Sequence, residues 1–202
     1  MSRKRVVIFI SGGGSNMEAL IRAAEAADFP AEVVAVFSDK AEAGGLARAQ
    51  GAGIATQVFR RKDYASKDAH EDAILEALAA LKPDIICLAG YMRLLSGRFI
   101  APYEGRILNI HPSLLPLFPG LHTHQRALDA GMKVAGCTVH LVTEGMDEGP
   151  ILAQAAVPVH DGDDAQTLAA RVLKAEHKLY ALALRKFAGQ QTEPADGMVV
   201  SA

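Results

Sequence analysis

Short apolar runs alternate over the first hundred residues with segments in which apolar residues recur every three or four positions. The runs predict buried strands, and the spaced pattern predicts amphipathic helices. The expected strands are 6–10, 33–37, 54–59 and 84–89, and the expected helices are 16–27, 41–50 and 68–81. Apolar strands separated by helices are typical of parallel sheets. We therefore expect an α/β fold: a doubly wound, mostly parallel twisted sheet with helices on both faces.

The pattern changes after residue 100. A short strand over 107–110 runs into a loop from His111 to Gly120 that contains Pro112, Pro116 and Pro119. Because each proline fixes φ and restricts the residue before it, this loop is expected to be rigid. A helix over 123–130, strands over 135–143 and 150–157, and a long helix over 163–187 are expected to follow. We expect residues 1–188 to form a single domain and the polar residues 189–202 to be a frayed tail.

Composition and charge narrow the class of protein. The chain has 202 residues, of which 50% are hydrophobic and 22% charged, and its net charge is −2. These values indicate a globular chain, and neither a basic excess nor tryptophan is present to indicate a nucleic-acid partner. The apolar runs are too short to span a membrane. Cys87 and Cys137 lie in apolar runs and are expected to be buried thiols in a reducing compartment, so we expect the protein in the cytoplasm.

The segment 11–16, Ser-Gly-Gly-Gly-Ser-Asn, follows a predicted strand and precedes a predicted helix. Glycines let backbone N–H groups approach an anion, and a helix start offers unpaired donors and a positive dipole end. Ser15 followed by Glu18 fits a capping box. The run matches neither a dinucleotide fingerprint nor a Walker loop. It therefore favours a phosphate monoester, the alternative being a tight turn without a ligand.

Asn109 and His111 are two residues apart on a predicted strand, so their side chains point to the same side where the proline loop begins. An amide donor beside an imidazole can hold one oxygen atom, which suits a carbonyl that acquires negative charge. The alternative is a structural histidine beside a capping asparagine. An acidic residue against His111 would favour its imidazolium form, and Glu144, Asp147 and Glu148 are equal candidates for this contact on composition.

Three other histidines and a threonine carry weaker signals. Thr138 and His140 share one face of a predicted strand and either line the pocket or pack in the core. His122 and His124 lack a third ligand at a zinc-like spacing, so they are expected to lie at a helix entrance. The sequence therefore predicts no metal site.

The segment 109–116, Asn-Ile-His-Pro-Ser-Leu-Leu-Pro, together with Pro119-Gly120 and the later Asp147, resembles the formyltransferase family that uses 10-formyltetrahydrofolate. The segments 11–16, 89–93 and 122–124 are similar to those of the members that act on phosphoribosylglycinamide. The resemblance runs from about Val6 to Phe187, which is nearly the whole chain.

This resemblance implies transfer of a formyl group from 10-formyltetrahydrofolate, as co-substrate, to the glycinamide amine of phosphoribosylglycinamide in purine biosynthesis. It implies that Asn109 and His111 stabilise the oxyanion and that Asp147 tunes His111. The residues implied to hold the substrate phosphate and ribose are Gly14, Ser15, Asn16 and Glu176. Those implied to bind the folate, besides Asn109, are Lys67, Met92, Arg93, Leu94 and Leu95.

The chain departs from the family pattern at Lys67 and at Leu173. Lys67 stands near a position where the family often has arginine. The lysine ammonium is a point charge and is expected to hold the glutamate tail of the folate less specifically than the planar guanidinium of arginine. Leu173 stands where some members carry a long polar residue, which is expected to leave more of the phosphate binding to the glycine segment.

Three other functions compete with this one. A formyltetrahydrofolate hydrolase usually has an extra N-terminal domain, for which the strand at Val6 leaves no room. A methionyl-tRNA formyltransferase has an added C-terminal domain and a basic surface, whereas this chain is short and slightly acidic. A non-catalytic phosphate-binding module would need the glycine segment but not Asn109 and His111. The expected partners are small-molecule substrates, without nucleic acid, membrane or metal, and the expected state is a monomer or weak homodimer.

Overall fold

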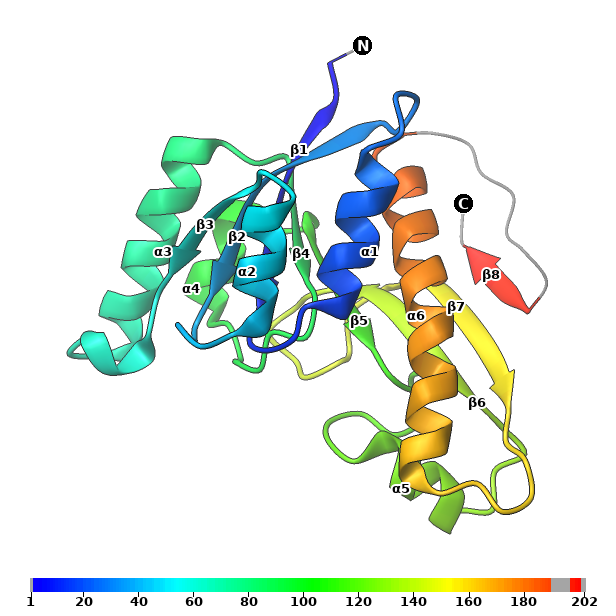
Figure 1. The fold of residues 1–202 in the computed structure, drawn as a ribbon. Helices are drawn as coiled ribbons and strands as arrows, with labels where there is room; N and C mark the ends of the chain where they lie inside the picture. The colour runs from blue at the N-terminus through cyan, green and yellow to red at the C-terminus, as the bar shows by residue number, and fades with distance from the viewer. Residues whose placement is uncertain (1, 190–196, 201–202) are drawn as a thin grey trace. The chain divides into compact units, whose positions relative to one another are not determined.

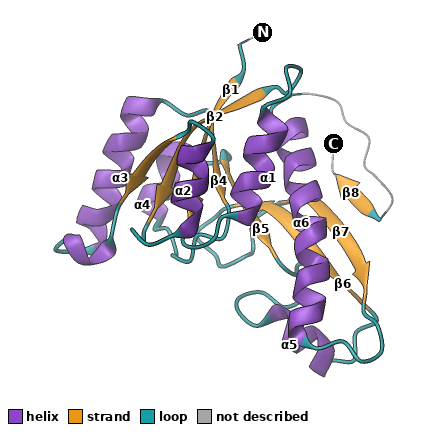
Figure 2. Ribbon diagram, viewed as in Figure 1, coloured by secondary structure: helices purple, strands orange, loops and turns teal. Residues whose placement is uncertain are grey.

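The structure is a computed structural model that describes residues 2–189 and 197–200. It divides into two compact units, of which the first ends at Leu108 and the second begins at Asn109. Figure 1 labels the elements along the chain, and Figure 2 colours them by type.

The first unit is built on four parallel strands in the order β3-β2-β1-β4. These are β1 (Lys4–Ile10), β2 (Ala31–Ser38), β3 (Ala55–Val58) and β4 (Ile85–Leu88). The central strand β1 is fully buried over 6–10, as its unbroken apolar run predicts. The strands predicted over the first hundred residues are therefore confirmed, with ends that differ by a few residues.

The helices of the first unit are α1 (Ser15–Ala24), α2 (Gly44–Gly51), α3 (Lys67–Leu81) and the short α4 (Gly97–Ile100), with single turns over Arg61–Asp63 and Ala101–Tyr103. Helix α1 packs beside α2, and α3 packs beside α4 (Figure 1). In α1 the buried apolar residues are Met17, Leu20, Ile21 and Ala24, which recur at helical spacing. The helices and strands thus alternate as the apolar pattern predicted.

The second unit carries strands β5 (Ile107–His111), β6 (Val134–Leu141), β7 (Ile151–Pro158) and β8 (Met198–Val200), in that order. β5 begins at the end of the first unit, and β6, β7 and β8 pair antiparallel. Helix α5 (Thr123–Asp129) follows the proline loop, and α6 (Ala165–Phe187) packs on β6 and β7 (Figure 2). The predicted α/β fold is confirmed, with an antiparallel portion that the sequence pattern did not indicate.

The predicted tail needs a correction. A frayed tail is not what the structure shows for Met198–Val200, because these residues form β8 and pair with Ala153, Gln154 and Ala155 of β7. The rest of the predicted tail, over 190–196 and 201–202, lies outside the described residues. The single domain over 1–188 stays a prediction.

Within the described ranges, no helix combines the length and the apolar character that crossing a membrane requires.

Candidate active site

The proline loop that follows β5 is tied to the strands beside it. The Thr138 hydroxyl on β6 donates to the carbonyl of Ser113 at 2.7 Å and accepts from the N–H of Leu115 at 3.0 Å. Gln154 on β7 donates to the carbonyl of Leu115 at 2.8 Å and to the Thr138 hydroxyl at 3.0 Å. The rigid loop predicted from its prolines is therefore braced by side chains as well. Thr138 is fully buried and braces this loop through these bonds.

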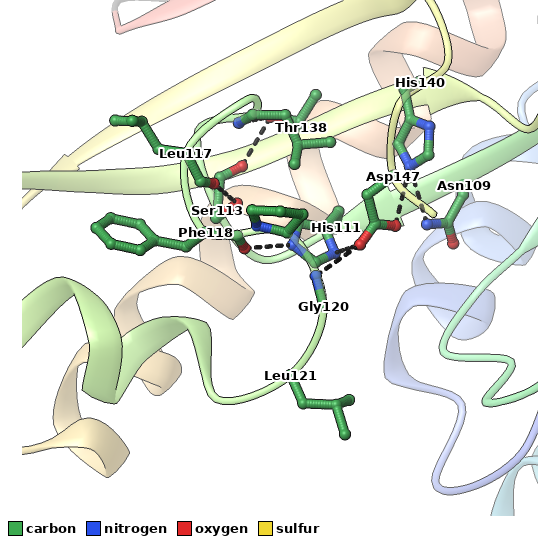
Figure 3. A network of polar contacts seen from close by, with 12 residues as sticks. Asn109, His111, Ser113, Leu117, Phe118, Gly120, Leu121, Thr138, His140 and Asp147 are labelled. Carbon is green, nitrogen blue, oxygen red and sulfur yellow. Dashed lines mark hydrogen bonds and ion pairs between the residues drawn. The ribbon is translucent and has the colours of Figure 1, made fainter. Parts of the chain in front are cut away.

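His111 ends β5 with both ring nitrogens next to oxygen atoms, as Figure 3 shows. Its Nε2 donates to the carbonyl of Phe118 at 3.0 Å, and its Nδ1 lies 3.3 Å from Oδ2 of Asp147. Its side chain is 7% exposed. A carbonyl and a carboxylate are both acceptors, so only the imidazolium, with an N–H on each nitrogen, can donate to both.

The backbone around Phe118 is shaped to present that carbonyl. Phe118 has φ 54, a left-handed conformation. The guanidinium of Arg126 lies over its ring at 5.5 Å from the centroid and donates to the carbonyls of Pro119 and Leu121. Sequence analysis missed the contact of Phe118 with His111, because a backbone carbonyl leaves no signal in the residue pattern.

Of the three acidic candidates, Asp147 is the one that contacts His111. Its Oδ2 also accepts from the N–H of Gly120 at 2.9 Å, which holds the carboxylate in place. Glu144 and Glu148 are exposed, and the carboxylate of Glu148 lies beside Gly145. Asp147 adopts φ 57, which aspartate tolerates better than most residues. The structure thus resolves a choice that composition left open.

Asn109 is held by His140, which the sequence had placed on the same strand face as Thr138. Nδ2 of Asn109 donates to Nε2 of His140 at 3.1 Å, and Nδ1 of His140 donates to the carbonyl of Leu141 at 3.0 Å. His140 is 2% exposed, and this burial lowers the pKa of its imidazole below the usual value; the carbonyl of Leu141 and the carboxylate of Asp147 act against that shift. The neutral ring is therefore favoured, which leaves Nε2 free to accept.

The glycine segment lies in the first unit, at the start of α1. Gly14 is the N-cap with φ 73, and no side chain caps the helix, so the expected capping box of Ser15 and Glu18 is wrong. Ser15 is instead the first helical residue, and Glu18 forms ion pairs with Arg22 and Arg48. Gly12 and Gly13 are exposed and Asn16 is buried. The exposed backbone at the start of a ten-residue helix keeps the geometry that anion binding needs.

Apart from Asn109, the residues expected to contact the folate lie in the first unit, around a hollow of about 310 Å³. Met92 and Leu94 are 65% and 63% exposed, which is unusual for apolar side chains of this size. The members of this lining are Arg61, Lys67, His70, Glu71, Tyr91, Met92, Arg93, Leu94 and Leu95. The structure therefore brings together the five residues of the first unit that the resemblance implies for folate binding: Lys67, Met92, Arg93, Leu94 and Leu95.

Buried acceptors hold the strip from Met92 to Leu95 at its two ends. The N–H of Met92 donates to the Ser11 hydroxyl at 2.9 Å, and Arg93 pairs with the buried Asp39 at 2.7 Å. The N–H of Ser96 donates to the buried Glu71 at 3.0 Å, whose carboxylate also lies 3.7 Å from Nζ of Lys67. These anchors were not predicted, because single buried serines and acids give no periodic signal.

The remaining candidates are placed as follows. Glu176 lies on α6 in the second unit and is 7% exposed. His122 is the N-cap of α5 with φ 58, and burial lowers the pKa of the half-buried His124, with a smaller contribution from His111. Among the described residues no group of three or more His, Cys, Asp or Glu could hold a metal ion.

Comparisons with known proteins agree on one family. The model of the formyl transferase family matches residues 4–184. The phosphoribosylglycinamide formyltransferase of Escherichia coli is 46% identical over 183 residues, which cover 91% of this chain and 86% of that protein. The trifunctional purine biosynthetic protein adenosine-3 of Bos taurus is 49% identical over 183 residues, but the chain spans only 18% of its length.

Solved structures give the same result. The crystal structure of phosphoribosylglycinamide formyltransferase from Brucella melitensis superposes with a TM-score of 0.91 and has 84% sequence identity to this chain. The match covers 96% of this chain and 100% of the Brucella melitensis chain. The crystal structure of glycinamide ribonucleotide transformylase 1 from Symbiobacterium toebii is 48% identical with a TM-score of 0.90, over 92% of this chain and 88% of that one. The α/β fold is thus shared with both.

Proposed function

The chain belongs to the formyl transferase family, and we propose that it transfers the formyl group of 10-formyltetrahydrofolate to the glycinamide amine of phosphoribosylglycinamide, in de novo purine biosynthesis. It is a folate-dependent formyltransferase, and 10-formyltetrahydrofolate is its co-substrate. The relatives of similar length that bear the name of this activity support the proposal.

The observation that carries the mechanism is the position of His111 between the carboxylate of Asp147 and the carbonyl of Phe118. The substrate amine attacks the formyl carbon directly, so a new C–N bond forms and the carbonyl oxygen becomes an oxyanion. The C–N bond to the folate nitrogen then breaks, and a proton from the amine ends on that nitrogen. Because the amine is itself the nucleophile, the proposal includes no enzyme nucleophile and no metal.

Asn109 and His111 supply the stabilisation of this oxyanion. One amide N–H of Asn109 is the donor to the oxyanion, and one such donor is typically worth about 3–4 kcal/mol to the transition state. The two N–H groups of the His111 imidazolium are donated to Phe118 and Asp147, so this ring acts through its positive charge. Asp147, held by the N–H of Gly120, favours the charged ring and fixes its orientation. Either His111 or a water carries the proton between the two nitrogens.

The phosphate and ribose of the substrate are assigned to Gly14, Ser15, Asn16 and Glu176. The exposed glycines before α1 and its positive N-terminal end support the phosphate assignment. Glu176 provides an acceptor on α6, which suits ribose hydroxyl groups.

The folate is assigned to the hollow that Met92, Arg93, Leu94 and Leu95 line with Lys67. The exposed side chains of Met92 and Leu94 offer an apolar surface for the pterin ring. Lys67 is half-exposed and offers one positive charge to the glutamate tail. Small-molecule substrates follow from the family. We further propose that the protein works in the cytoplasm as a monomer or weak homodimer, without nucleic acid or membrane.

The experiment that tests this function measures the consumption of 10-formyltetrahydrofolate with and without phosphoribosylglycinamide. We expect consumption only with the amine, and the formylated amide as the product. Formate release without the amine would instead identify a hydrolase. Binding of phosphoribosylglycinamide without any turnover would identify a phosphate-binding module, and formylation of methionyl-tRNA would identify the third alternative.

A further inference from the structure

The side-chain amide of Asn109 has two orientations that differ by exchange of its oxygen and nitrogen. Only one of them presents an N–H to an oxyanion, because the flipped amide would present an oxygen instead. The two orientations have nearly the same shape, so the hydrogen-bond partners of the amide decide between them. Something in the surroundings must therefore fix the amide if Asn109 is to stabilise negative charge in the proposed reaction.

His140 has the chemistry to make this selection. Its Nδ1 faces the carbonyl of Leu141 at 3.0 Å, and a carbonyl only accepts, so Nδ1 carries the proton of the neutral ring. Its Nε2 then has a lone pair, and the Nδ2 of Asn109 lies 3.1 Å from it. Flipping the amide would bring two lone pairs together, which is unfavourable in a site where His140 is 2% exposed.

We propose that His140 is a positioning residue of the formyl transfer: its neutral Nε2 accepts one N–H of Asn109 and so directs the other N–H of the amide to the oxyanion. This proposal rests on the function proposed above and adds a residue to its machinery. His140 acts through Asn109.

The charged groups around His140 give the contact a dependence on protonation. Asp147, on the loop after β6, has Oδ1 at 3.7 Å from Nε2 of His140, and His111, at the end of β5, is the other titratable group that faces it. A proton on Nε2 would remove the acceptor for Asn109 and create a donor toward Asp147 (Figure 3). The same carboxylate holds His111, so protonation of His140 would disturb Asn109 and His111 at once.

A double-mutant cycle tests this proposal. His140→Leu keeps a similar volume but removes the acceptor, and we expect it to lower kcat about tenfold while both KM values stay within about twofold, because only the orientation of a transition-state donor is lost. In the Asn109→Ala background the same change is expected to alter kcat less than about twofold. An equal loss of kcat in the wild-type and Asn109→Ala backgrounds would overturn the proposal. So would an unchanged kcat for His140→Leu in the wild-type background.

His140→Gln provides the conservative control and also serves if the leucine variant does not fold. A glutamine oxygen can accept from Asn109 but takes up no proton in the working pH range. We expect the wild type to show a decline of kcat on the acid side as His140 is protonated. We expect His140→Gln to recover most of the turnover and to lose this decline. The titration of the substrate amine is common to both enzymes, so it cancels in the comparison. An acid-side decline identical to that of the wild type would overturn the proposal.

The failure of this proposal is distinguishable from the failure of the function. Wild-type transfer to phosphoribosylglycinamide in the same assay establishes the function, and the cycle then tests His140 alone. An inactive wild type in that assay would overturn both.

Discussion

The carboxylate of Asp147 is shared among three groups of the site. Oδ2 accepts from Gly120 and faces Nδ1 of His111, and Oδ1 lies 3.7 Å from Nε2 of His140. One residue therefore connects the charge of the imidazole at His111 with the ring that orients Asn109. Its side chain is 13% exposed, so solvent screens these interactions only partly.

Asp147→Asn tests this role. The variant keeps the shape but loses the negative charge, so the imidazolium of His111 is no longer favoured and its orientation is no longer fixed. We expect kcat to fall by at least about 100-fold, with both KM values nearly unchanged. The matched control is Glu148→Gln, which removes a charge from an exposed neighbour and should leave kcat within about twofold. Similar losses from both variants would contradict a specific role for Asp147.

At the scale of residues, the sequence identified Asn109 and His111 but not the groups that they contact. The period of two along a strand placed Asn109 and His111 on one side, and the structure agrees. The sequence could not choose among Glu144, Asp147 and Glu148, because the choice depends on how the loop folds back. The contacts of His111 and Asp147 with the backbone of Phe118 and Gly120 left no pattern at all.

At the scale of elements, the glycine segment owes its shape to a close approach of two backbones. Gly45 in α2 donates to the carbonyl of Gly12 at 3.1 Å. A Cβ at Gly45 would lie 3.1 Å from Cα of Gly14, 3.2 Å from the oxygen of Gly12 and 2.6 Å from the end of the Ile10 side chain. The start of α2 therefore fixes the backbone that is proposed to bind phosphate.

Gly45→Ala is expected to displace this segment by a few tenths of an ångström. We expect the KM for phosphoribosylglycinamide to rise by at least about threefold with little change in kcat, and the free energy of unfolding to fall by about 1–3 kcal/mol. Steady-state kinetics and thermal unfolding measure the two effects. Gly44→Ala is the matched control, because its added Cβ would meet nothing within 4 Å. A KM that responds equally to both changes, or to neither, would contradict the account.

The elements themselves were largely predictable, because apolar periodicity reports burial directly. The strands and helices from β1 to α6, except the short α4, which was not predicted, lie within a few residues of their predicted ranges. The capping box at Ser15 failed because Gly14 takes the cap position with a positive φ, which no side-chain pattern indicates. The strand β8 was missed because three residues are too few to show a period.

At the scale of the whole molecule, buried histidines make folding sensitive to acid. Burial lowers the pKa of both His140 and His124 below the ordinary value of about 6.5. As the pH falls through about 6.5, the unfolded chain takes up protons that the folded chain resists, so stability is lost in this range. The carboxylates of Glu18 and Asp84 act at lower pH: ionic and hydrogen-bond partners lower their pKa values, so their contribution is lost only as the pH falls through the depressed values.

We therefore expect the thermal midpoint to decline between about pH 7 and pH 5, and to decline less steeply in His140→Gln, which has one buried imidazole fewer. Calorimetry at a series of pH values checks this. His160→Gln is the control, since it removes an exposed histidine. Parallel curves for the wild type and His140→Gln would show that His140 is not held neutral by folding.

At this scale the fold class was predictable from the alternation of strands and helices, and the family from the segment 109–116. The division into two units and the antiparallel pairing of β6 with β7 were not. Strand direction depends on how the connecting loop closes, and the apolar pattern of a strand is the same for either direction.

The central claim is that a charged His111 and the amide of Asn109 together stabilise the oxyanion of formyl transfer. It is tested most directly by kcat of His111→Ala for transfer from 10-formyltetrahydrofolate to phosphoribosylglycinamide, with the Kd of each substrate measured alongside. The account predicts a fall in kcat of at least about 100-fold with both substrates still bound at wild-type affinity. A near-normal kcat in this variant would contradict it.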